Sequence, residues 1–405
     1  MVMKRFLLFL ATGLLTTFSA QAQVQPFENG FYRAENTGSH GWIFVYDNYS
    51  SGVIGTSTSY DVSALSSFKS FKNIVSNYGS VVYVMKEGTG YNLYAQGTDV
   101  MSFTNGLVIY LREKGNTGTY RMYSKYKGAE ASLYDMETSK EEGQISTTGT
   151  DGFQYWRIVP VSAESDNYLG ITPSLEHDGS YYKSFYASFA TTFASSGMSA
   201  FYVKRITDDG AAIIAPIEDK VPACTPVIVK CASASYEGNR INPLFESDGN
   251  PADNQLKGVY FSHIFDRLGL VQYKTSGHLV YTAFDPNTMR VLGKTADGRL
   301  GLVNSTSAPS VISFNDSDNN PKMALTANSC YVTVAAGTNA ELPLLTEDEY
   351  PAWQELMSVQ SIKAGATEGR TGVYTLSGQQ LNVTGNTDGL RPGVYVVNGQ
   401  KQLVR

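Results

Sequence analysis

Short runs of aromatic and β-branched residues, broken at close intervals by Gly, Asn and Asp, dominate this sequence. The chain of 405 residues contains 27 Tyr, 19 Phe and 38 Gly. Aromatic and Thr-rich runs favour β-strands, whereas Gly, Asn and Asp favour the tight turns between strands. Few long stretches carry the period of an amphipathic helix. We therefore predict a mainly β fold.

Composition and charge limit the classes of protein to which the chain can belong. Hydrophobic residues make up 42% of the chain and charged residues 17%, which is typical of a globular rather than a disordered protein. A chain of this length is expected to form two or three domains. The formal net charge is −6, and no block of basic residues stands out. Because nucleic-acid binding needs clustered Lys and Arg, we predict no nucleic-acid partner.

The N-terminus has the pattern of a secretory signal peptide over residues 1–22. Lys4 and Arg5 precede an apolar stretch that ends at Phe18, and a small-x-small sequence closes at Ala22. A membrane-spanning helix needs about 20 apolar residues, and this stretch is shorter. We predict cleavage between Ala22 and Gln23, a secreted or outer cell-surface location, and no transmembrane segment in the mature chain.

Residues 23–160 are predicted to form the first domain. Four residues, Tyr32, Arg33, Tyr46 and Asp47, recur 88 positions later as Tyr120, Arg121, Tyr134 and Asp135. Half of that spacing is about one leaf of a three-leaf β repeat, whose middle leaf would hold residues 81–84 and 91–94. The stretch resembles the ricin-type β-trefoil-like modules of secreted proteins, which implies a β-trefoil-like domain. The alternative is a β-sandwich in which the recurrence of these four residues is a coincidence.

The resemblance to ricin-type modules also implies a carbohydrate site. Leaves of that type often bind sugar with an acidic residue and a stacking aromatic. Here Asp47 with Trp42 or Tyr46 would have those roles, and Asp135 with Tyr134 would repeat them. An aromatic face packs on the apolar face of a sugar ring, while a carboxylate accepts hydrogen bonds from its hydroxyls. The alternative is that these aromatics fill the β core.

Residues 161–340 are predicted to form a second, β-sandwich-like region. Large and small residues alternate over 182–193, as in a strand with one buried face, and Asp297-Gly298 between apolar runs predicts a hairpin. Turn-and-strand segments at 221–229 and 325–334 flank this hairpin. The order of these motifs resembles a β-rich repeat region of surface and secreted Bacteroidetes proteins, and that resemblance implies no catalytic residues.

The C-terminal part is predicted to consist of a linker at 341–365 and a small β domain at 366–405. The linker is expected to contain a short helix that runs through Trp353. In the small β domain, Asn398-Gly399 predicts a tight hairpin turn. The sequences GVYTLSGQ and LRPGVYVVNGQK, which begin at Gly372 and Leu390, resemble the type IX (Por) secretion C-terminal sorting domain. The resemblance implies that export machinery reads this tail for passage across the outer membrane. A small β domain without a sorting role is the alternative.

Motifs for catalysis and metal binding are missing from the sequence. None of the four His lies at the spacing of a zinc site, and there is no C-x-x-C pair, G-x-S-x-G elbow or P-loop. We therefore predict no cofactor and no metal site. The three Cys, Cys224, Cys231 and Cys330, are an odd number, so their pairing stays open; small semi-buried residues are the simplest interpretation.

Three functions fit these features. The leading hypothesis is an exported binding or adhesion protein without a catalytic site, whose partner is a glycan or a protein of the host or cell surface. The second is a secreted hydrolase that acts on glycans or proteins. The third is a β-trefoil protease inhibitor, whose activity would lie in an exposed loop.

Overall fold

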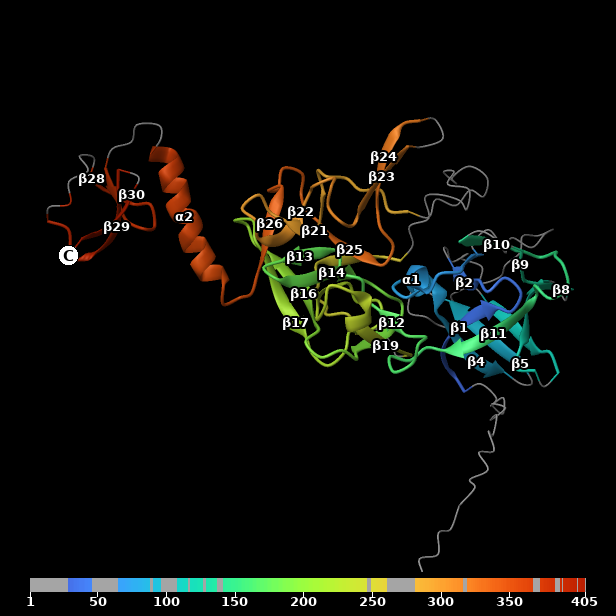
Figure 1. Cartoon of the computed structure of the whole chain (residues 1–405). Helices are drawn as coiled ribbons and strands as arrows, with labels where there is room; N and C mark the ends of the chain where they lie inside the picture. The colour runs from blue at the N-terminus through green and yellow to red at the C-terminus, as the bar shows by residue number, and fades with distance from the viewer. Residues whose placement is uncertain are drawn as a thin grey trace, which may run out of the picture.

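The structure is a computed structural model, and it describes residues 28–45, 65–87, 90–95, 108–115, 117–126, 129–136, 141–245, 249–260, 281–315, 319–366, 372–382, 387, 389–398 and 400–404. Over these residues the protein is mainly β, with 48% strand and 7% helix, and its strands form several sheets (Figure 1). The predicted fold class is confirmed at this level. The cleavage site predicted at Ala22 and Gln23 lies outside the described residues.

A closed ring of six antiparallel strands organises the N-terminal part. In spatial order the ring contains β1 (Gly30–Asn36), β4 (Val82–Glu87), β5 (Gly90–Ala95), β6 (Val108–Glu113), β7 (Tyr120–Tyr126) and β11 (Tyr155–Pro160). Each strand pairs with the next, and β11 pairs back to β1. The sheet thus curls until its edges meet.

Shorter elements extend from this ring. They are β2 (Trp42–Val45), β3 (Leu65–Phe68), α1 (Phe71–Ile74), η1 (Tyr78–Ser80), β8 (Ala129–Ser132), β9 (Tyr134–Asp135) and β10 (Glu142–Ser146). Strand β2 pairs with β1 and β3, and β10 joins β3 to β9. Strand β8 pairs with β7.

Period-two alternation explains the core of the ring, because successive side chains of a strand point to opposite faces. The inward positions are apolar and at most 2% exposed: Ala34, Leu93, Leu111, Met122 and Trp156. The indole N–H of Trp156 donates a hydrogen bond to the carbonyl oxygen of Leu133, at 3.1 Å. Trp156 therefore fills the core and satisfies its polar atom there.

Most of the described residues that recur at a spacing of 88 positions lie on strands of this ring. Tyr32 on β1 and Tyr120 on β7 are both buried in its core. Residues 81–84 and 91–94 lie on or beside the paired strands β4 and β5. Tyr46, the third of the recurring residues, is outside the part of the chain that the structure describes.

A ten-stranded sheet forms the main body of residues 161–345. In spatial order it contains β13 (Leu175–His177), β14 (Ser180–Phe185), β18 (Val227–Cys231), β16 (Ser199–Ile206), β17 (Ala212–Ile217), β26 (Glu341–Leu345), β22 (Leu300–Val303), β21 (Met289–Lys294), β25 (Ser329–Thr333) and β20 (Leu256–Val259). Strands β17 and β26 are parallel, and the other neighbouring strands of this sheet are antiparallel. Apolar residues from both ends of this order share one core, so the sheet curls around it.

Two smaller sheets accompany the ten-stranded one. Three strands, β12 (Leu169–Gly170), β19 (Arg240–Leu244) and β15 (Ala190–Phe193), form the first. The hairpin of β23 (Val311–Asn315) and β24 (Pro321–Leu325) forms the second. The 3-10 turn η2 (Tyr236–Gly238) directly precedes β19.

One apolar cluster joins the ring to the region that follows it. Phe31 and Tyr78, from the N-terminal part, pack with Phe185 and Phe189 of the second region. The ring centroids of Phe31 and Phe189 are 5.6 Å apart, and those of Tyr78 and Phe185 are 5.3 Å apart. The two parts therefore share a core across residue 160.

Two sequence expectations differ from this arrangement. The stretch 182–193 was expected as one strand, but it divides between β14 and β15 in different sheets, because residues 186–189 turn to bond other loops. The linker was expected to start at 341, but Glu341–Leu345 is strand β26, with Leu342 fully buried between β17 and β22.

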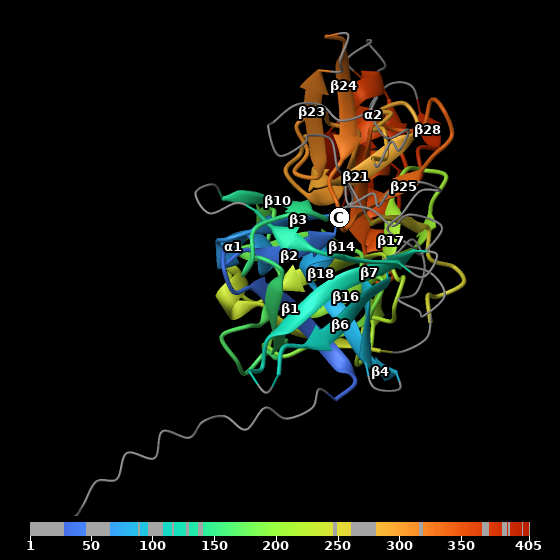
Figure 2. The same cartoon turned by 90° about the vertical axis from the view of Figure 1, so that its right-hand side faces the viewer.

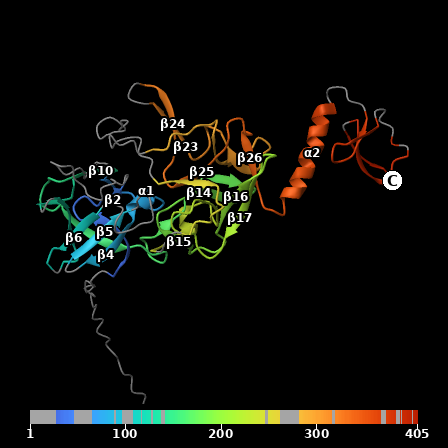
Figure 3. The same ribbon diagram turned by 180° about the vertical axis from the view of Figure 1, so that it is seen from behind.

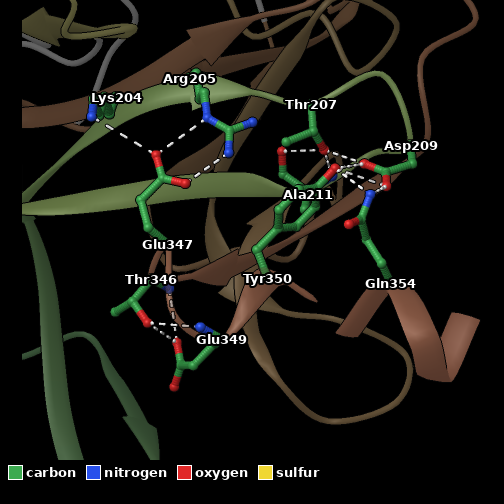
Figure 4. A network of polar contacts seen from close by, with 10 residues as sticks. All are labelled: Lys204, Arg205, Thr207, Asp209, Ala211, Thr346, Glu347, Glu349, Tyr350 and Gln354. Atoms are coloured by element: carbon green, nitrogen blue, oxygen red, sulfur yellow. Dashed lines mark hydrogen bonds and ion pairs between the residues drawn. The ribbon is translucent and has the colours of Figure 1, made fainter. Parts of the chain in front are cut away.

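Helix α2 (Tyr350–Ala366) follows β26 and is fixed to the body at its first turn. The hydroxyl of Tyr350 and the side-chain amide of Gln354 both donate to the carboxylate of Asp209, each at 2.8 Å (Figure 4). Trp353 is only 8% exposed and packs in a small apolar cluster of the body. The predicted helix is present and is longer than expected.

A four-stranded sheet closes the chain. It contains β28 (Gln380–Asn382), β27 (Val373–Tyr374), β29 (Gly393–Val397) and β30 (Gln400–Val404). Val397 pairs with Gln400 across a two-residue turn, and Asn398 there has φ 50°. The predicted Asn-Gly hairpin is thereby confirmed. Seen from the front and from behind, this sheet lies beyond α2, apart from the other sheets (Figure 3).

The structure also bears on membrane, metal and thiol chemistry. No helix among the described residues is long and apolar enough to cross a membrane. Within the same residues, no group of three His, Cys, Asp or Glu is placed to hold a metal ion. Cys224, Cys231 and Cys330 form no disulfide bond with one another. Burial raises the pKa of Cys231 and of Cys330 to about 12, so both stay as neutral thiols.

Lys183 on β14 is expected to destabilise the fold at neutral pH. Burial lowers the pKa of its amine from the ordinary 10.5, and the neighbouring Cys231 and Cys330 offset this in part. The unfolded state holds the ammonium at neutral pH, whereas the folded state must either bury that charge or release the proton. As the pH rises toward 10.5, the folded state releases its proton first, so stability rises.

Lys183→Met should therefore raise the free energy of unfolding at pH 7 by about 0.5–2 kcal/mol. The gain should shrink between pH 7 and pH 10, because the cost of burying the wild-type amine falls as the pH approaches its ordinary pKa of 10.5. Chemical denaturation at both pH values measures the effect. Lys230→Met, on the neighbouring strand β18, is the matched control. An equal gain at the two pH values would contradict this account.

Candidate functional site

A pocket of about 510 Å³ lies where the N-terminal part meets the segment that follows β11. Its lining residues come from four places in the sequence: Trp42 of β2, Phe71 of α1, Arg157 to Pro160 of β11, and Ser165, Asp166 and Asn167 of the next loop. We call it the junction pocket. Its volume is within the range of small-ligand sites, which is roughly 300–1,000 Å³.

Strand register sets one wall of the junction pocket. Trp42 is directly opposite Glu35, and Glu35 is directly opposite Arg157, on the adjacent strands β2, β1 and β11. Residues opposite one another in antiparallel strands share a face of the sheet. The Glu35 carboxylate forms an ion pair with the Arg157 guanidinium and lies 3.5 Å from a ring nitrogen of His40. The half-buried Trp42 thus lies next to the ion pair of Glu35 and Arg157.

Arg33 fixes the loop that carries the pocket residue Asn167. Its side chain is fully buried, and one terminal nitrogen donates to Asn167 Oδ1 at 2.7 Å and to the Tyr168 carbonyl at 2.9 Å. The other nitrogens donate to the Ile74 carbonyl at 3.1 Å and to Ser80 Oγ at 3.0 Å. Burial lowers the pKa of Arg33 to about 9, so the guanidinium remains charged at neutral pH. It therefore ties the 165–168 loop to the ring.

Asn167 holds the 165–168 loop against β11. Its side-chain amide donates to the carbonyl oxygens of Val159 and Pro160, at 3.0 and 2.9 Å. With its own oxygen held by Arg33, Asn167 has a fixed orientation in the pocket wall. Asp166, the preceding residue, is exposed and forms no hydrogen bond or ion pair with the described residues. Its carboxylate remains available to a ligand.

Phe71, which lines the junction pocket, belongs to a stack of aromatic and cationic groups. The Arg33 guanidinium lies 5.5 Å from the centre of the Phe71 ring, and Tyr168 meets the same ring edge-on at 5.3 Å. On the far side, Arg240 lies 3.9 Å above the Tyr168 ring. Cation–π contacts of this kind stabilise and orient the rings. The Phe71 face is thus fixed in place before any ligand arrives.

The structure describes three of the five residues that the sequence suggests for a sugar site. Trp42 lines the junction pocket. Asp135 is fully buried and accepts a hydrogen bond from Ser39 Oγ at 2.6 Å, so its carboxylate supports the turn before Trp42. Tyr134, half-buried, packs against Gly149. The predictions for Tyr46 and Asp47 concern positions outside the described residues.

The other pocket residues had no recognisable signal in the sequence. Phe71, Arg157 and Asp166 stand in unremarkable local contexts, and only the folding of β2, α1 and β11 brings them together. The Trp at position 42 was the one signal that could be read. No protein-family model matches the chain, and no curated protein matches it.

Proposed function

We propose that this protein is an exported, non-enzymatic binding protein that recognises a glycan in the junction pocket. The observation that carries the proposal is the half-exposed Trp42 beside the fixed Phe71 face and the unpaired Asp166 carboxylate. Aromatic faces stack on the apolar face of a sugar ring, and a carboxylate accepts its hydroxyl hydrogen bonds. The combination is that of a sugar site.

The arrangement of strands supports a β-trefoil for the N-terminal part. A trefoil consists of a six-stranded barrel and hairpins at one end, and the closed ring with its β2–β3 and β9–β10 hairpins has this character. The pocket lies beside one of these hairpins rather than within a single leaf. The proposed ligand thus contacts the trefoil and the loop after it.

The export route is part of the same proposal. The signal-peptide pattern of residues 1–22 and the C-terminal motifs at Gly372 and Leu390 support passage through both membranes. Export machinery is then the expected partner of the C-terminal sheet. A glycan ligand fits this route, because glycans are abundant outside the cell.

Trp42→Ala should weaken glycan binding at least 10-fold, a loss of about 1.4 kcal/mol. The reason is the loss of the stacking face from a pocket whose other walls stay in place. The purified mature chain is first screened on a glycan array, and the affinity of the variant for the best ligand is then measured by calorimetry. Phe245→Ala removes a 40% exposed aromatic outside the pocket and is the control.

Three results would count against this function. The absence of binding to every glycan on the array would exclude the proposed ligand class. Equal losses of affinity in the two variants would exclude the junction pocket as the binding site. Cleavage of a bound glycan would indicate the hydrolase instead of the binding protein. Unchanged melting temperatures show that neither variant acts through unfolding.

A further inference from the structure

We propose a second binding surface, for acidic polysaccharides, on the outer face of β6, β7 and β11. Its cations are Arg112, Lys114 and Arg121, and its ligand is a chain that carries carboxylates or sulfates. The surface does not depend on the junction pocket. Figure 2 shows β6 and β7 side by side, in agreement with their pairing.

Strand alternation directs these side chains outward. Leu111 and Met122 point into the core of the ring, so Arg112 and Arg121, their neighbours in sequence, point to solvent. The side chain of Arg112 is 54% exposed and that of Arg121 is 29% exposed. Lys114, just beyond β6, is exposed as well. The three cations therefore share one accessible face.

The charges on this face are not balanced. Arg112 and Arg121 are directly opposite each other on β6 and β7, where like charges destabilise a sheet. One carboxylate, that of Glu130 on β8, lies 2.8 Å from Arg112 and 3.5 Å from Arg121. It can neutralise one of the two guanidinium groups. With Lys114, the face keeps an excess of positive charge in a chain whose net charge is −6.

Tyrosine rings hold the cations in position. Both guanidinium groups lie over the ring of Tyr123, at 4.9 Å for Arg112 and 5.4 Å for Arg121. The Lys114 ammonium lies 3.8 Å from the ring centre of Tyr155. Long cationic side chains normally lose much conformational entropy on binding, and this stacking removes part of that loss in advance. The face is thus preorganised for an anion.

The chemistry of the face indicates a polysaccharide. Guanidinium groups match carboxylates and sulfates with paired hydrogen bonds, and each Arg here has donors beyond those that Glu130 occupies. Three cations that share one exposed face of the ring suit an extended chain. Single-stranded nucleic acid would also need bare aromatic faces for its bases, whereas cations cover Tyr123 and Tyr155.

The test compares binding of the full mature chain to polygalacturonate, dextran sulfate and neutral dextran at 50 and 200 mM NaCl. We expect binding to at least one acidic polymer that weakens with salt, and none to dextran. Arg112→Gln/Lys114→Gln should lower that affinity at least 10-fold and reduce its salt dependence, as expected when ionic contacts are lost. The Trp42→Ala variant should bind the acidic polymer normally.

The control is Lys257→Gln/Arg391→Gln, which removes the same two charges from exposed positions elsewhere. No binding to either acidic polymer at 50 mM NaCl would overturn the proposal. So would equal losses in the two double variants, or tighter binding to single-stranded DNA. If the Arg112 variant does not fold, Lys114→Gln alone, at an exposed position, should still lower the affinity several-fold.

Discussion

Arg33→Met is expected to lower the free energy of unfolding by about 3–5 kcal/mol. The guanidinium is fully buried and donates to four acceptors on Ile74, Ser80, Asn167 and Tyr168. Methionine fills a similar space but cannot donate, so Asn167 Oδ1 and the Tyr168 carbonyl oxygen lose the donor that Arg33 supplies. Each orphaned buried group costs about 1–3 kcal/mol. The Ile74 carbonyl oxygen keeps its hydrogen bond from the Ser80 hydroxyl. Removal of a buried charge offsets part of this sum.

Chemical denaturation of the two proteins measures this difference. Arg299→Met is the matched control, because the Arg299 side chain is 38% exposed and forms a surface ion pair with Asp297. The control should change stability by less than about 1 kcal/mol. A similarly small effect at Arg33 would show that its hydrogen bonds contribute little to the junction between the two parts of the chain.

Trp156→Ala should destabilise the protein by about 3–5 kcal/mol through the cavity that it leaves in the ring. Trp156 is among the largest fully buried side chains. Trp156→Phe should cost less, about 1–3 kcal/mol, because it keeps most of the packing and leaves the Leu133 carbonyl oxygen without its donor. Thermal unfolding followed by circular dichroism gives the order, and equal losses in the two variants would contradict it.

Local turn chemistry explains what the sequence could predict. Asp297-Gly298 lies between β21 and β22, and Gly298 has φ 84°, which glycine adopts without strain. The Asn398 turn between β29 and β30 is equally local. Both hairpins depend on a few adjacent residues, so the pattern of those residues was sufficient.

Long-range pairing explains what the sequence could not predict. Strand β26 looked like part of a linker because its partners, β17 and β22, lie about 40 to 130 positions earlier in the chain. The same holds for the junction pocket. Trp42 was a visible candidate, but the exposed carboxylate of Asp166 lines the same pocket only because the loop after β11 folds back onto β2 and α1.

The apolar cluster shared across residue 160 limits how this chain can be divided. A fragment that ended there would lose Phe185 and Phe189, and the rings of Phe31 and Tyr78 would face water. It would also lose Asn167 and with it one wall of the junction pocket. The ring and the curled sheet are thus a single unit for biochemical work, although the sequence reads as two modules.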